Sequence, residues 1–252
     1  MKNAAPSGRM ALLILAQAMV ICYNNSKGGV MMKKNTLWVI LTAVVCCGLM
    51  ALVDGVIRPG YAVKSAIKIG VFLLIPFLLS RLVPEVRFRE VFHFSRKGVL
   101  LSLGLGTAVY GLILGGYFLL RDVFDFSNIV DSLTSNAGVS RKNFLYVSLY
   151  ISFVNSLLEE FFFRGFLFTN LKCSANRGLA YGFSATAFAL YHVAMMLGWF
   201  SPVLFLLVMV GLTAGGVIFN YLNEKLDTLF ASWIVHMFAN FAINTIGFIL
   251  MG

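Results

Sequence analysis

The sequence has few charged residues. Only 12% of its 252 residues are Asp, Glu, Lys or Arg, whereas 60% are hydrophobic. A soluble domain typically carries about 25% charged residues, so this chain has too few to cover a globule of its size with a hydrated surface. Intrinsic disorder is excluded as well, because disordered chains combine low hydrophobicity with high net charge. The composition therefore predicts a polytopic membrane protein.

Cysteine and histidine are scarce too. The four cysteines, Cys22, Cys46, Cys47 and Cys173, form no CxxC pair and have no Cys/His spacing typical of a zinc site. We expect buried packing residues within the membrane rather than a disulfide framework. The net charge of +10 would suggest nucleic acid in a soluble chain. Here it indicates topology, because Lys and Arg flank membrane spans, and we predict no nucleic-acid partner.

Long apolar runs make up most of the chain. A spanning helix needs about 20 mainly apolar residues, and the runs are continuous rather than alternating, which disfavours a β-barrel. We predict an all-α, polytopic bundle of seven to eight transmembrane helices. The seven main spans are expected at residues 37–57, 62–82, 99–120, 144–171, 179–198, 202–222 and 228–250, and residues 11–22 are a short eighth candidate.

The sequence is expected to have three parts. They are an N-terminal extension (1–35), a group of N-terminal transmembrane helices (36–135) and a C-terminal membrane core (136–252).

Basic residues in the loops predict the orientation of the spans. The 83–98 loop is rich in Arg and Lys and is expected in the cytoplasm, whereas the 121–143 loop has balanced charges and is expected outside. The N-terminus of the spanning region is therefore expected in the cytoplasm. Arg58, Lys64 and Lys68 lie on the opposite side in this scheme and weaken it.

The informative residues are the polar groups inside predicted spans. Each charged group there costs about 2.5–3.5 kcal/mol to insert, so it is usually functional or paired. Three predicted spans contain clusters of charged or polar side chains. They are Glu159, Glu160 and Arg164 in residues 144–171, His192 in residues 179–198, and His236, Asn240 and Asn244 in residues 228–250.

Helical spacing relates these groups to one another. Glu160 and Arg164 are four residues apart and are expected to pair on one face, while Glu159 points about 100° away. At 1.5 Å per residue, Glu159 and His192 lie about 20 Å from the expected cytoplasmic ends of their spans, and His236 about 12 Å. The three can therefore converge. Each alone is explained by an ion pair or an interhelical hydrogen bond, but together they indicate a site.

In this order, the motifs resemble those of the CPBP intramembrane protease family, which includes type II CAAX prenyl endopeptidases and Abi-type proteins. The EExxxR motif falls at residues 159–164, FxxxH at 188–192 and HxxxN at 236–240. The resemblance covers about residues 140–250. It implies a CPBP-type helical core with a buried hydrolytic site. The phenylalanines nearby are expected to face lipid or pack; they are Phe161, Phe162, Phe163, Phe166 and Phe168.

The resemblance also implies catalytic residues, namely Glu159, Glu160, His192, His236 and Asn240, supported by Arg164. Glu159 would activate the attacking water with help from His192. His236 and Asn240 would stabilise the oxyanion, and Glu160 with its arginine would hold the site together. These roles agree with amide hydrolysis in general, which needs a base and hydrogen-bond donors aimed at the developing oxyanion.

A metal ion is the open alternative. Glu159, His192 and His236 have the composition of a catalytic zinc set with two histidines and one glutamate. They come from three separate helices, however, without the HExxH spacing that makes a zinc prediction strong. Glutamate-activated water without a metal is slightly favoured, and no other cofactor is expected.

The leading functional prediction is an endopeptidase that cleaves a membrane-associated or lipid-proximal peptide. Bacterial relatives are associated with bacteriocin processing or self-immunity, so we expect a bacterial cell membrane. A non-catalytic immunity or interaction protein of the same fold is the main alternative. A proton-coupled transporter is less favoured, because no broken-helix inverted repeat is evident. The expected partners are membrane lipid and a peptide or membrane-protein substrate.

The N-terminal extension has two interpretations. Residues 11–22 are apolar and follow two basic residues, as in a signal peptide, but no convincing cleavage site comes after them. Alternatively, residues 27–30 read Lys-Gly-Gly-Val, which a purine-rich ribosome-binding site would encode if read in frame. In that case Met31 or Met32 is the true start of the protein.

The second interpretation is the favoured one, and it predicts the mass of the native protein. Intact-mass analysis of the protein purified from its own cells should show a chain that begins at Met31 or Met32. A mass that includes Met1 would refute this interpretation.

Overall fold

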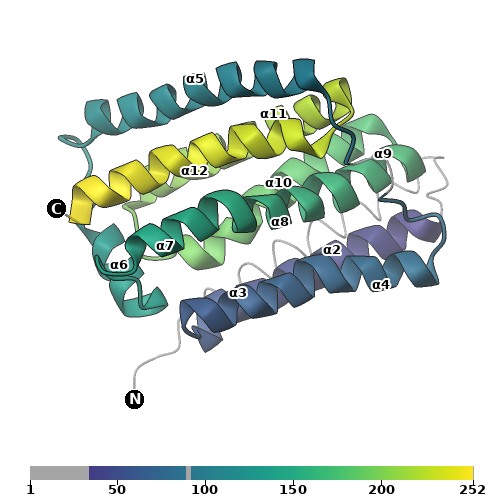
Figure 1. The fold of residues 1–252 in the computed structure, drawn as a ribbon. Helices are drawn as coiled ribbons and strands as arrows, with labels where there is room; N and C mark the ends of the chain where they lie inside the picture. Colours follow the sequence, from purple (N-terminus) through teal and green to yellow (C-terminus); the bar gives the residue numbers. More distant parts are fainter. Residues whose placement is uncertain (1–33, 89–91, 252) are drawn as a thin grey trace.

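The computed structural model describes residues 34–88 and 92–251, so the expectations for residues 1–33, including a span at 11–22, lie outside the described residues. The described residues form helices and no strand, which confirms the all-α prediction. The helices run roughly side by side along one direction (Figure 1).

Within residues 34–88 and 92–251, six helices are long and apolar enough to cross a membrane. The first two are α2 (Lys34–Leu52) extended by η2 (Val53–Ile57), and α3 (Tyr61–Ile69) extended by η3 (Gly70–Leu74) and α4 (Ile75–Leu82). The others are α5 (Arg96–Leu120), α10 (Arg177–Met196), α11 (Pro202–Leu226) and α12 (Leu229–Met251). A shorter helix, α6 (Ser127–Ala137), follows α5. These six correspond to six of the seven predicted main spans.

The seventh predicted span is a helix that contains Glu159, Glu160 and Arg164 and is not among those six. Five consecutive segments build this central helix without a break: α7 (Phe144–Leu149), η4 (Tyr150–Asn155), α8 (Ser156–Glu160), η5 (Phe161–Phe168) and α9 (Thr169–Ser174). In Figure 1 it lies between α12 on one side and the α2–α4 layer on the other. Glu159, Glu160 and Arg164 are all buried, so the neighbouring helices shield them from lipid.

Two π-helical segments, η4 and η5, flank the turn that carries both glutamates. Such segments are frequent at functional sites. Their carbonyl oxygens accept hydrogen bonds from side chains of neighbouring helices, at Ile151 and Phe153 from α12 and at Phe163 from α10. Every backbone polar group in a membrane needs a partner within the protein, so these bonds both satisfy the central helix and fix its neighbours.

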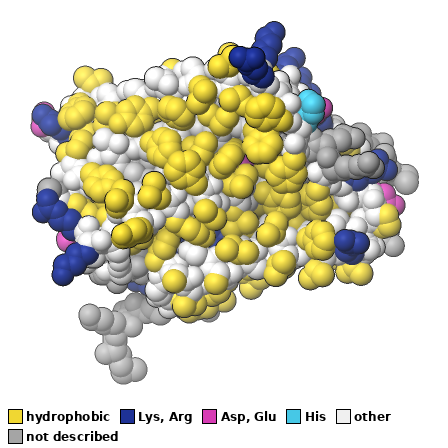
Figure 2. Space-filling view, in the orientation of Figure 1, with side chains coloured by type: hydrophobic (Ala, Val, Ile, Leu, Met, Phe, Trp, Pro, Cys, Tyr) yellow, Lys and Arg dark blue, Asp and Glu magenta, His cyan; other side chains and the backbone are white. Residues whose placement is uncertain are grey.

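The outer surface is apolar along the helices. Figure 2 shows a broad band of hydrophobic side chains across the visible face, with Lys and Arg gathered toward its ends. Leu112 and Leu119 of α5 and Val203 and Leu206 of α11 are strongly exposed. Apolar side chains between two charged ends are what a bilayer requires of a spanning bundle. The chain is an integral membrane protein.

Two expectations about side chains are partly wrong. Cys46 and Cys47 are buried as expected, but Cys173 is exposed because it lies at the very end of the central helix. The phenylalanines of η5 do not face lipid. All of this segment is buried, and Phe162 stacks on Phe72 of η3 with ring centroids 4.1 Å apart.

Helices α10 and α11 approach each other closely at Gly216. A Cβ atom at this position would lie 2.9 Å from Cα of Ala185 and 3.3 Å from its carbonyl oxygen. Small residues at helix interfaces allow such close contact in membranes. The contact matters for the site, because the carbonyl oxygen of Gly216 also accepts a hydrogen bond from Arg164.

Gly216→Ala should therefore destabilise the protein by about 1–3 kcal/mol, because the added methyl group presses on the backbone of α10. Gly215→Ala is the matched control, since nothing lies within 4 Å of a Cβ there. Alanine is also the better helix former by about 1 kcal/mol. Thermal unfolding in detergent, followed by circular dichroism, compares the two variants, and equal melting temperatures would contradict this account.

Candidate active site

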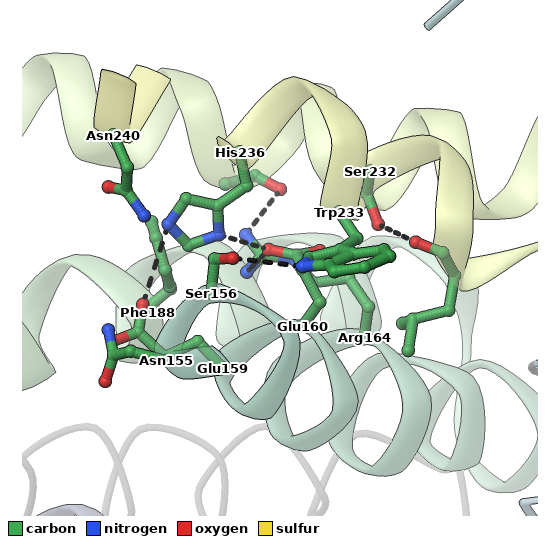
Figure 3. A network of polar contacts seen from close by, with 12 residues as sticks. Asn155, Ser156, Glu159, Glu160, Arg164, Phe188, Ser232, Trp233, His236 and Asn240 are labelled. Carbon is green, nitrogen blue, oxygen red and sulfur yellow. Dashed lines mark hydrogen bonds and ion pairs between the residues drawn. The ribbon is translucent and has the colours of Figure 1, made fainter. Parts of the chain in front are cut away.

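Side chains from three helices converge on the carboxylate of Glu159. His192 of α10 and His236 of α12 each place Nε2 3.7 Å from Oε2 of Glu159. All three side chains are buried. Figure 3 shows His236 turned toward the helix that carries both glutamates. The structure thus brings together the three groups that helical depth predicted to be neighbours.

Glu160 contacts the other ring nitrogen of His236, Nδ1, and forms a second cluster there. Its Oε1 accepts from Nη1 of Arg164 at 3.0 Å and from Nδ1 of His236 at 2.9 Å. The Arg164 guanidinium is completely buried and lies 4.3 Å from the ring centre of Phe188. The pairing predicted from the four-residue spacing is therefore confirmed, and the pair also fixes one histidine ring.

The hydrogen bonds of Nδ1 determine which nitrogen of each histidine faces Glu159. Nδ1 of His192 donates to the carbonyl oxygen of Phe188 at 2.7 Å, and Nδ1 of His236 donates to Glu160. Because a carbonyl oxygen can only accept, the proton of a neutral His192 lies on Nδ1. In both rings Nε2 is left facing the Glu159 carboxylate, as an acceptor when the ring is neutral and as a donor when it is charged.

Lys68 of α3 also belongs to this cluster. From the sequence, it is interpreted only as a basic residue that bears on the orientation of the spans. It is 3% exposed, and its Nζ lies 2.5 Å from Oε1 of Glu159 and 2.5 Å from Oδ1 of Asn155. Asn155 also donates from Nδ2 to the same glutamate oxygen at 3.0 Å. A signal was present in the sequence, because a lysine inside the span predicted at 62–82 is costly and needs a partner.

Asn240 lies on the same face of α12 as His236 but contacts a different group. Its Nδ2 donates to the carbonyl oxygen of Ile151 at 3.2 Å. Asn244, one turn further, donates to Ser148 in the same way. Both amides therefore tie α12 to the central helix. Within the described residues no second partner is seen for the Asn240 amide group.

Glu159, His192 and His236 are the residues that would hold a metal ion in the alternative mechanism. They offer one oxygen and two nitrogens, but no group of three or more His, Cys, Asp or Glu among the described residues could hold a metal ion. The ammonium of Lys68 also lies against the carboxylate that would be a ligand.

The fold and this cluster define a polytopic helical membrane protein with a buried glutamate–histidine centre. Residues 141–242 match a family model described as Type II CAAX prenyl endopeptidase Rce1-like. The matched segment covers less than half of the chain but contains all three motifs, so the resemblance to the CPBP family is confirmed for this segment. This segment of the membrane protein is therefore similar to type II CAAX proteases. No curated protein and no solved structure matches the chain.

Loss of one partner of the buried Glu160–Arg164 pair should be strongly destabilising. Arg164→Met leaves the Glu160 carboxylate buried without its counter-charge, which costs about 3–5 kcal/mol. The double variant Glu160→Gln/Arg164→Met should recover part of this loss. Unfolding in detergent compares the wild type, the single variants Arg164→Met and Glu160→Gln, and the double variant.

The matched control is Arg177→Met, which breaks an ion pair with Glu224 whose arginine is 63% exposed. An exposed pair contributes about 0–1 kcal/mol, so little loss is expected. Equal losses for Arg164→Met and Arg177→Met, or strictly additive losses in the double variant, would contradict the role of the buried pair.

Proposed function

We propose that the protein is an intramembrane endopeptidase that hydrolyses a peptide bond of a membrane-associated or lipid-proximal substrate. Glu159 activates the attacking water. The observation that carries this proposal is the position of Oε2 of Glu159, 3.7 Å from Nε2 of both His192 and His236. A buried carboxylate between two imidazoles is a suitable acceptor and donor of protons during hydrolysis.

In the proposed reaction, Oε2 of Glu159 takes a proton from water as the water oxygen attacks the substrate carbonyl carbon. His192 orients this water through Nε2. The C–N bond then breaks, and the proton held by Glu159 passes to the departing amine, so that the carboxylate is regenerated. The enzyme is unchanged at the end of the cycle, and no nucleophilic serine or cysteine is needed.

The developing oxyanion needs hydrogen-bond donors. His236 can donate from Nε2 only when its ring carries both protons. Because Nδ1 already bonds to Glu160, Nε2 is the ring nitrogen left to face the substrate. Asn240 contributes the amide N–H that is not bonded to Ile151.

The substrate class follows from where the site lies. Its residues sit within helices that face lipid on their outer sides, so a soluble globular substrate has no direct access. The family description of the matched segment also names a prenyl endopeptidase, which supports a peptide held next to lipid. We propose a bacterial cell membrane, with the start of the spanning region in the cytoplasm as the loop charges predict.

Glu159→Gln should abolish cleavage, with kcat reduced by about 10²–10⁴-fold, because the amide keeps the shape of the side chain but cannot accept the proton. The probes are a farnesylated CAAX peptide, the same peptide without the lipid, and a membrane-spanning peptide, each presented to purified protein in liposomes. Mass spectrometry in ¹⁸O-labelled water detects hydrolysis as label in the new carboxyl group.

Glu224→Gln is the matched control, since this glutamate pairs with Arg177 and Tyr181 away from the Glu159 cluster. It should cleave like the wild type. Cleavage that persists in Glu159→Gln would contradict the role of Glu159, whereas a wild type that cleaves none of the probes would favour an immunity or interaction protein. Loss of activity with a chelator, restored by zinc, would contradict the metal-free mechanism.

A further inference from the structure

We infer that Lys68 and Asn155 are positioning residues that hold one oxygen of Glu159 and leave the other to act on water. The inference rests on the proposed function and adds two residues outside the three motifs. Lys68 also lies outside the segment that matches the family model, which begins at residue 141. Part of the site would then be supplied by the N-terminal helices.

The geometry forms a closed ring of three contacts. Nζ of Lys68 donates to Oε1 of Glu159 and to Oδ1 of Asn155, and Nδ2 of Asn155 donates to the same Oε1. Any rotation of the carboxylate group would break two of these contacts. Because Oε1 is held by two donors, Oε2 is left as the oxygen that faces both histidines.

Lys68 cannot easily move away from this position. Its ammonium lies 4.9 Å from the ring centre of Tyr191 and 5.5 Å from that of Phe72. Tyr191 directly precedes His192 in α10, and Phe72 packs on the central helix through Phe162. The lysine is thus fixed by the same elements that hold the glutamate and the histidine.

Charge balance gives Lys68 a second effect on the site. Glu159 and Glu160 are adjacent and buried, and each contacts its own cation, Lys68 or Arg164. Without Lys68, the charge of Glu159 would be balanced only by the two imidazoles. A buried carboxylate requires a counter-charge at contact distance. Lys68 therefore frees His192 and His236 for contact with water and substrate.

The neighbouring Lys64 offers a matched control within the same helix. It lies one turn from Lys68 and forms an ion pair with Asp54, with side chains that are 17% and 2% exposed. This pair makes no direct contact with Glu159 in the described residues. Lys64→Met therefore removes a largely buried lysine from α3 without removing a contact of the catalytic carboxylate.

The experiment compares kcat, KM and melting temperature of the variants on whichever probe peptide the wild type cleaves. Lys68→Met should lower kcat by about 100-fold with KM changed less than about twofold, the effect of a misplaced reacting group. Asn155→Ala should lower kcat by about tenfold through loss of its hydrogen bonds to Glu159 and Lys68. Lys68→Arg should restore part of the loss, because it keeps the charge but not the compact geometry. Lys64→Met should keep kcat within about twofold.

Two results would overturn the inference. One is equal kcat for Lys68→Met and Lys64→Met, which would make Lys68 a structural residue only. The second result applies if Lys68→Met does not fold. In that case, a kcat equal to that of the wild type in both Lys68→Arg and Asn155→Ala would overturn the inference.

Failure of the proposed function is recognised separately. If the wild type cleaves none of the probes, the hydrolase proposal fails, and with it the positioning role. The melting temperatures of Lys68→Met, Glu159→Gln and the double variant would still test the pairing itself, because a contacting pair gives non-additive losses. Additive losses would contradict the contact.

Discussion

Burial of charged side chains inside an apolar bundle decides how the helices of this protein pack. A charge buried there must have an opposite charge at contact distance, or the helix that carries it will not be stable. Three such pairs lie inside the described helices. They are Asp54 with Lys64, Glu159 with Lys68, and Glu160 with Arg164. Two of the three meet at the turn that also faces both histidines, so charge pairing and the candidate site are one arrangement.

The central helix is the element that this arrangement requires. It carries both glutamates, and its π-helical segments present carbonyl oxygens to side chains of α10 and α12. The N-terminal helices contribute more than a membrane anchor, because α3 supplies the cation for Glu159. The ion pair between Lys68 and Glu159 thus links α3, which lies outside the segment that matches the family model, to the helix that carries both glutamates.

Relations within a helix could be predicted from the sequence, whereas relations between helices mostly could not. Residue spacing gave the Glu160–Arg164 pair, the divergence of Glu159 and the positions of the spans, because a helix has a fixed period and rise. Lys68 and Glu159 are 91 positions apart, and no periodicity states that α3 lies beside the central helix. For the same reason the sequence did not predict the hydrogen bond between Asn240 and Ile151, which are 89 positions apart. Nor did it predict that other helices cover the phenylalanines of η5.

The proposed roles of Glu159 and Lys68 require an ionised carboxylate at Glu159, paired with the ammonium of Lys68. Infrared difference spectroscopy of the protein in lipid bilayers, comparing the wild type with Glu159→Gln at neutral pH, measures this directly. If Glu159 is ionised and paired with Lys68, the substitution removes carboxylate stretching bands, and these bands shift in Lys68→Arg. Loss of the carbonyl band of a protonated acid instead, with no carboxylate bands lost, would contradict an ionised Glu159.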